Sequence, residues 1–408
     1  MFFINKLKNP VFIFLVIFSV KYPYIPVSSS KLIAFIGMFC LFVDFFFKNK
    51  KINITVIKYL IFNVLITSII LINVIFINSS NDYTFISKFV LIAVEIPLCA
   101  YVFLWINKGI EQNIIYIEFI RAFFLACVIQ AIISLFLFIV PEIREGVFNI
   151  LQYPEELIAM SQFRLVGIGY YFFDLAVIFG LGFFCFTYML TYEKVPFYYY
   201  ILVLILVIAG FLTARTFLIF IVLSVMFFIT NRNFIFKFSK IIIFGVLGVF
   251  FLYFILPYNI SDKFMTVIPW AFEYIFSLLD GSGVETSSTN VLKSMFVDYS
   301  YYTAMFGDGY YVDPKDPTLY YRSTDSGLMR PILYFGFPAF IMQIILMFGL
   351  VLFIKSKSIF KLSMIVLVCA SILTIKGHVV YFGSVVDKYL IFVFIISLYQ
   401  CREDQCSL

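Results

Sequence analysis

The chain has 408 residues, of which 63% are hydrophobic and only 13% are charged, and its formal net charge is +6. Soluble domains carry about 25% charged residues, so this composition excludes a protein whose surface lies mostly in water and indicates an integral membrane protein. The seven cysteines lie in apolar runs or in the C-terminal tail, and this placement gives no disulfide framework.

Apolar runs of about 20 residues predict membrane-spanning helices. We expect twelve, the first of them uncleaved because no small-residue cleavage site follows it. They lie near residues 9–27, 32–47, 54–77, 84–106, 118–140, 166–190, 197–213, 216–230, 241–257, 328–354, 360–375 and 383–400.

Basic residues decide the orientation of these spans. The segments "KNKK" (48–51), "RNFIFKFSK" (232–240) and "KSKSIFK" (355–361) fall on the same side as Lys6 and Lys8 when the spans alternate. Basic residues favour the cytoplasm, so both termini are expected there. The sequence thus predicts an all-α polytopic protein, with residues 1–408 forming a single integral membrane domain.

Two outer loops are long enough to suggest function. The first covers residues 141–165. The second covers residues 258–327, between the ninth and tenth spans, and contains "DKFMTVIPWAFEYIFSLL" and "TNVLKSMFVDYSYYTAM". Aromatic side chains among sparse charges favour helices that lie in the plane of the membrane interface.

Five of the eight arginines map to the outer side, against the usual bias. Four of them, Arg164, Arg215, Arg322 and Arg330, lie close to the ends of predicted spans. Snorkelling to lipid phosphates would explain any one of them. Four at one membrane level favour binding of an anchored anion, because the guanidinium group matches phosphate oxygens.

The segment 305–340 carries the densest set of candidate ligands. Gly307 and Gly309 flank Asp308 in a predicted turn, and tyrosines, including Tyr310 and Tyr321, are interleaved with further charges. Tyrosines and carboxylates suit sugar hydroxyls. A solvated surface loop is the alternative, because Asp-Gly and Asp-Pro are ordinary turn signals.

Three more residues have two interpretations each. Asp325 precedes a predicted span and would act as a helix cap or as a general base. His378, the only histidine, would be structural or catalytic. Asp174 is predicted to be buried inside a span, where a carboxylate is a functional candidate that could pair with Arg164 or Arg215.

The sequence lacks the motifs of several other enzyme classes. The sequence has no Walker loop, zinc-protease motif or nucleophile elbow. One histidine without outer cysteines does not supply a transition-metal site, so neither a metal nor a cofactor is expected. The "GLGFF" (180–184) and "GIGYYFFDLAVIFG" (167–180) segments favour close helix packing over phosphate binding.

Three segments resemble the bacterial O-antigen polymerase (Wzy) family, in the superfamily shared with O-antigen ligases. They are "FRLVGIGYYFFDLAVIFG" with its Arg-x-x-Gly entry, the "LTART" turn, and "FGDGY…STDSGLMRPILYFGFPAF". The number of spans and the late outer loop extend this resemblance over nearly the whole chain.

The resemblance implies a metal-independent glycosyltransferase with a GT-C-like fold and an active site on the periplasmic face of the bacterial inner membrane. Donor and acceptor would be undecaprenyl-diphosphate-linked oligosaccharides. Arg164 and Arg215 would hold the pyrophosphate, Arg322 and Arg330 a second diphosphate or the sugar chain, and a Wzz-type co-polymerase would set chain length. Nucleic acid is not expected as a partner.

One departure bears on the reaction. The ligases carry a His-Asn pair where this chain has Thr324-Asp325. This difference favours a polymerase over a ligase and makes Asp325 the first candidate for the base, with His378 second. A lipid-linked oligosaccharide flippase is the rival from another class, although the charges lie at the outer boundary and no inverted repeat is seen.

Overall fold

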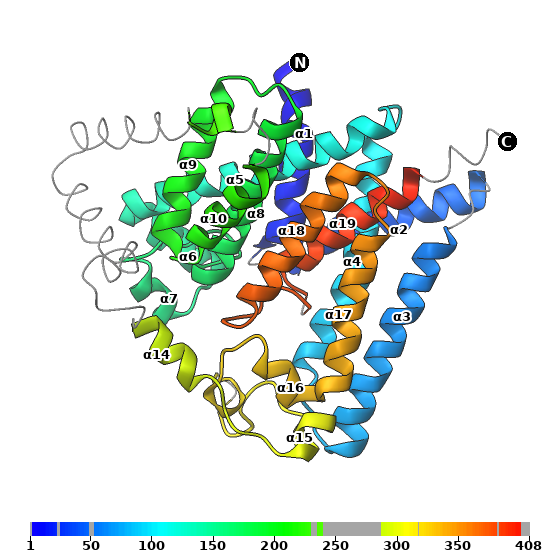
Figure 1. Ribbon diagram of the computed structural model, residues 1–408, viewed down its shortest axis with the longest axis vertical. Helices are drawn as coiled ribbons and strands as arrows, with labels where there is room; N and C mark the ends of the chain where they lie inside the picture. Colours follow the sequence, from blue (N-terminus) through cyan, green and yellow to red (C-terminus); the bar gives the residue numbers. More distant parts are fainter. Residues whose placement is uncertain are drawn as a thin grey trace. The chain divides into compact units, whose positions relative to one another are not determined.

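The described part of the chain is mostly helical in the computed structural model (Figure 1). The structure describes residues 2–22, 25–48, 53–229, 235–239, 287–316, 318–381 and 383–400. Within these ranges five helical segments are long and apolar enough to cross a membrane: Ser29–Lys48, Ile54–Ile77, Thr84–Ile106, Ile114–Ile139 and Phe172–Tyr192. The predicted all-α, multi-pass character is therefore confirmed.

The chain divides into two compact units. Unit 1 comprises Met1–Ser30 and Ile117–Thr286, and unit 2 comprises Lys31–Tyr116 and Ser287–Leu408. Each unit thus joins segments that are distant in the sequence.

Unit 1 is built around one buried helix, α8 (Phe172–Tyr192), which packs against α9 (Tyr198–Thr213) and α10 (Phe217–Phe228). Every residue of α8 from Leu175 to Leu190 is buried. The other elements of unit 1 are α1 (Phe2–Phe18), β1 (Lys21–Tyr22), β2 (Ile25–Ser28), α5 (Gln112–Ile139), α6 (Pro141–Leu151) and α7 (Glu155–Met160).

Glycines allow the close approach of helices in unit 1. A Cβ atom on Gly180 would collide with the Phe220 ring, and one on Gly182 would come within 2.8 Å of Cys127 Cβ. The predicted close packing of the "GLGFF" segment is confirmed. Gly167 and Gly169, by contrast, lie in a non-helical turn before α8, where Gly169 has φ +78°.

Unit 2 packs α4 (Thr84–Ile106) against α3 (Ile54–Leu71) and α19 (Val385–Gln400), and α17 (Phe337–Leu352) against α3, α18 (Lys357–Leu373) and α19. Helix α3 continues into the π-helical turn η1 (Ile72–Ile77). The remaining elements are α2 (Ser29–Lys48), α14 (Ser287–Ser294), α15 (Tyr301–Phe306), the 3-10 turn η2 (Tyr321–Ser323) and α16 (Met329–Phe335).

The tenth predicted span is not one helix. Gly336, with φ +84°, separates α16 from α17. The carbonyls that end α16 find partners elsewhere in unit 2: Leu333 accepts from the Asp308 N–H (2.5 Å), Tyr334 from the Gly309 N–H (3.1 Å), and Phe335 from Asn73 Nδ2 (2.7 Å). Such a break is stable because no buried carbonyl at the break loses its hydrogen bond.

Two other predicted boundaries differ. The first helix ends at Phe18, and Lys21–Tyr22 and Ile25–Ser28 form an antiparallel strand pair where the span 9–27 was expected to continue. The sixth span begins at Phe172 and not at residue 166. Predicted span 241–257 and the loop up to residue 286 lie outside the described residues.

Candidate functional site

The late loop, which is the described part of residues 258–327, is held in place by a carboxylate from the N-terminal part of the chain. Asp82, in the link between η1 and α4, accepts the N–H groups of Tyr311 (2.7 Å) and Val312 (3.0 Å) on Oδ2. Its other oxygen accepts the Thr84 N–H at 3.0 Å, and its carbonyl accepts the Tyr334 hydroxyl. One residue therefore fixes the late loop, α4 and α16 together.

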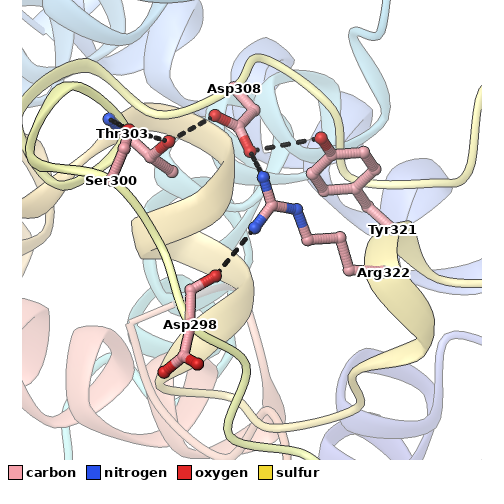
Figure 2. Close-up of polar contacts among 6 residues, drawn as sticks. All are labelled: Asp298, Ser300, Thr303, Asp308, Tyr321 and Arg322. Carbon is pink, nitrogen blue, oxygen red and sulfur yellow. Dashed lines mark hydrogen bonds and ion pairs between the residues drawn. The ribbon is translucent and has the colours of Figure 1, made fainter.

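Three of the predicted ligands form a cluster of their own (Figure 2). Asp308 Oδ2 accepts Arg322 Nη2 at 2.9 Å and the Tyr321 hydroxyl at 3.1 Å, while its Oδ1 accepts the Thr303 hydroxyl at 2.7 Å. Arg322 also donates to the carbonyl of Asp298 at 2.9 Å. The sequence offered these groups as partners for sugar hydroxyls or as charges of a solvated loop, and in the structure they also hydrogen-bond to one another within the loop.

Tyrosine rings surround Arg330. Its Cζ lies 3.4 Å from the ring centroid of Tyr320 and 4.0 Å from that of Tyr311, and only 5% of the side chain is exposed. A guanidinium stacks well on aromatic faces and stays charged when buried. The site therefore has a fixed positive charge inside an aromatic wall.

Asp325 lies at the open side of this arginine. Its Oδ1 is 3.3 Å from Arg330 Nη1, and 54% of its side chain is exposed. Desolvation by the surrounding protein raises the pKa of the Asp325 carboxyl, while Arg330 and then Lys376 act in the opposite direction. The result is an accessible carboxylate that is held in place and is a stronger base than an ordinary aspartate.

The capping interpretation of Asp325 is wrong. The N–H groups of Leu328 and Met329, at the start of α16, point to the Ser326 hydroxyl at 3.4 Å each. Ser326 in turn donates to the Ile375 carbonyl at 2.8 Å. Asp325 is therefore left for another role.

His378 joins the same cluster from the link between α18 and α19. Its ring lies 5.6 Å from the Tyr311 ring, edge to face. Burial lowers the pKa of His378 well below its usual value, and the positive charges of Arg330 and Lys88 lower it further. His378 is thus neutral at pH 7 and a weaker base than a free histidine.

Tyr310 faces the Asp308 cluster, and its ring lies 5.6 Å from that of Tyr321. In all, unit 2 brings together two adjoining groups of predicted residues. They are Asp308, Tyr310, Tyr321 and Arg322 in one, and Asp325, Arg330 and His378 in the other.

Arg164 and Arg215 are near each other in unit 1. Arg215 is 9% exposed and lies in the short link between α9 and α10, as the "LTART" turn predicted. Burial lowers the pKa of Arg164, and the positive charge of Arg215 lowers it further. Two mutually repelling cations would be stabilised by an anion.

The first outer loop supports this arginine pair. Residues 141–160 form α6 and α7, and the Tyr153 hydroxyl donates to the Gly167 carbonyl and accepts the Gly169 N–H, both at 2.9 Å. Leu165 N–H donates to the Leu212 carbonyl at the end of α9 (3.3 Å). The Arg-x-x-Gly segment is therefore held beside the "LTART" turn.

Asp174 differs from its prediction. Because α8 begins at Phe172, this carboxylate lies in the first helical turn and is exposed, not buried within a span. A negative charge there is favoured by the helix dipole alone.

Sequence reasoning missed Asp82, Lys88 and Lys376. Lys88 Nζ lies 5.9 Å from the centroid of the Tyr311 ring, and Lys376 acts on the pKa of Asp325. Asp82 and Lys376 lie in the short links "NSSND" and "IKGH", and Lys88 lies near the start of α4; their only signal in the sequence was charge near a span end. Among the described residues, no three His, Cys, Asp or Glu side chains lie together as metal ligands would.

No protein-family model, no curated protein and no solved structure matches the chain.

Proposed function

We propose that this protein is an oligosaccharide repeat-unit polymerase of the O-antigen type. The observation that carries the proposal is the exposed Asp325 carboxylate, set beside a buried arginine between two tyrosine rings. A base for a sugar hydroxyl, a positive charge that holds this base in place and aromatic faces for a sugar ring are groups that this reaction uses.

In the proposed reaction, Asp325 accepts the proton of an acceptor hydroxyl on the new repeat unit. The hydroxyl oxygen forms a bond to the anomeric carbon of the growing chain. The bond from that carbon to the diphosphate oxygen breaks, and undecaprenyl diphosphate leaves with the electron pair. The raised pKa of Asp325 strengthens it as the proton acceptor.

The arginines divide into two roles in this proposal. Arg164 and Arg215 are the pyrophosphate ligands that the resemblance implies, and the positive charge of Arg215 lowers the pKa of Arg164. Arg330 orients Asp325 and keeps it ionised, while Arg322 orders the saccharide-facing loop through Asp308. His378, being neutral, serves as a hydrogen-bonding group and not as the first base.

The proposal includes the setting that the sequence resemblance implies. The chain would have about twelve spans and a GT-C-like fold, lie in the bacterial inner membrane and act on its periplasmic face. Its substrates would be undecaprenyl-diphosphate-linked donor and acceptor, and a Wzz-type partner would set chain length.

The test is the banding of surface polysaccharide on a gel. A strain lacking this gene is complemented with the wild type, Asp325→Asn, Asp325→Glu, Arg215→Ala or Arg215→Lys. The matched control is Asp316→Asn, since Asp316 is an exposed carboxylate of the same loop that accepts the N–H and hydroxyl of Thr318. Membrane levels of every variant are measured alongside.

We expect the wild type and Asp316→Asn to restore a long ladder, and Asp325→Asn and Arg215→Ala to leave a single-repeat band at normal protein level. Long chains in the deletion strain would overturn the proposal. Polymer stranded on its lipid carrier would indicate a ligase, and lipid-linked single repeats retained on the cytoplasmic face would indicate a flippase.

A further inference from the structure

Large aromatic side chains are exposed on and around α15. Tyr301 is 80% exposed and Tyr302 is 49% exposed, and three more rings close to them in sequence are also exposed. These are Phe296, Tyr299 and Phe306. We call these five residues the α15 aromatic surface. Large apolar side chains left exposed near one another on a folded protein mark an interaction site.

The orientation of α15 is fixed, so this exposure is not that of a loosely held segment. Ser300 caps the helix by accepting the Thr303 N–H at 3.0 Å, and the buried Thr303 hydroxyl donates to Asp308 at 2.7 Å (Figure 2). Thr303 thus points into the protein. The rings of Tyr302 and Phe306, one helical turn apart, pack together at 5.3 Å outside it.

α15 also lies at the ends of two apolar helices. The Phe306 carbonyl accepts Asn78 Nδ2 at 3.2 Å, and Asn78 directly follows the candidate span Ile54–Ile77. On the other side, a Cβ on Gly336, just before apolar helix α17, would collide with the Met305 carbonyl. Within unit 2, α15 is seen beside the ends of α3 and α17 (Figure 1).

Two further rings are exposed at these junctions. They are Phe76, near the end of the candidate span Ile54–Ile77, and Phe337, at the start of the shorter apolar helix α17. The nearby charges, Lys293 and Asp298, are of opposite sign. The partner is therefore selected by amphipathic aromatic contact and not by net charge.

We propose that the α15 aromatic surface lies in the headgroup layer of the membrane and anchors the late loop there. Tyrosine rings are favoured at this depth because the ring is apolar and the hydroxyl reaches water, and phenylalanine suits the apolar face of a helix that lies in the interface. The anchor fixes the height of the loop, and hence of Asp308 and Arg322, relative to the bilayer. The inference concerns membrane contact only and does not depend on the proposed reaction.

Tryptophan fluorescence in liposomes tests this placement. The native tryptophans, Trp105 and Trp270, are replaced by Phe, and one reporter is introduced as Tyr301→Trp. Leu319→Trp is the matched control, because Leu319 is also exposed but its backbone hydrogen-bonds to Asp313 and Asp316 in a polar segment. Quenchers are phosphatidylcholine with a nitroxide on the headgroup, phosphatidylcholine with a mid-chain nitroxide, and aqueous iodide.

We expect the headgroup nitroxide to remove the larger part of the Tyr301→Trp emission, the mid-chain nitroxide to remove less, and iodide to have a small effect. Leu319→Trp should respond mainly to iodide. Strong iodide quenching of Tyr301→Trp without lipid quenching would overturn the proposal and leave the surface for a water-borne partner such as a saccharide. Because no substrate is present, failure here leaves the polymerase test unaffected.

Discussion

The Asp82 carboxylate accepts the backbone N–H of Tyr311 at 2.7 Å, across 229 residues of sequence. Tyr311 in turn contacts Arg330, Lys88 and His378 with its ring. A residue outside the late loop thus decides where the aromatic face of the candidate site lies.

Replacing Asp82 by asparagine tests this connection. Each Asp82 oxygen accepts at least one N–H, and an amide would present an NH₂ group to either Thr84 or the late loop. An unsatisfied buried group costs about 1–3 kcal/mol, and because Asp82 is only half-buried we expect a loss of stability at the low end of this range. Thermal unfolding in detergent measures this, and Asp316→Asn is the control. Equal midpoints for the two variants would contradict the role given to Asp82.

Exchange of Arg330 for lysine preserves the charge but removes the planar group between Tyr311 and Tyr320. Each cation–π contact contributes roughly 0.5–2 kcal/mol, and an ammonium group does not stack in the same way. We expect a lower unfolding temperature and a shortened polysaccharide ladder for Arg330→Lys. Arg402→Lys, the same exchange in the C-terminal tail, should behave as the wild type. A full ladder from Arg330→Lys would mean that polymerisation needs only a positive charge at this position and not the planar group.

The pH dependence of the proposed reaction follows from Asp325. The reaction needs the ionised carboxylate, so the rate falls as pH decreases through the pKa of Asp325, which desolvation raises above the ordinary value. Lys376 acts to lower this pKa, so Lys376→Met should move the acid limb to higher pH. Initial rates of repeat-unit polymerisation in proteoliposomes measure the limb, with Lys315→Met as the control. A shift to lower pH would contradict the assignment.

Gly336 should tolerate no side chain. Its φ of 84° and ψ of 168° lie in a region essentially restricted to glycine, where another residue costs about 1–3 kcal/mol, and a Cβ would also collide with the Met305 carbonyl. Gly349 lies within α17, and a Cβ added there would meet no atom within 4 Å, so Gly349→Ala should stabilise the helix by up to roughly 1 kcal/mol. The two alanine variants should therefore shift the unfolding midpoint in opposite directions. Similar midpoints would show that the break at Gly336 is not required.

Hydrophobic composition was enough to predict a helical membrane protein, because a chain this apolar has to satisfy its backbone hydrogen bonds within helices. Local pattern also placed the turn at Arg215 and the close packing at Gly180 and Gly182. The total of twelve spans and their orientation remain predictions.

Features that depend on contacts between distant residues were decided by the tertiary structure, because no short sequence window contains both partners. The break at Gly336 depends on distant donors from Asp308, Gly309 and Asn73, and no window of sequence around residue 336 includes all of them. The exposure of Asp174 depends on where α8 begins, and the pairing of Arg322 with Asp308 depends on the fold of the late loop. Sequence determined which residues carry charge near the membrane boundary. Long-range hydrogen bonds and ring contacts determined which of those charges neutralise one another and which, like Asp325, stay accessible.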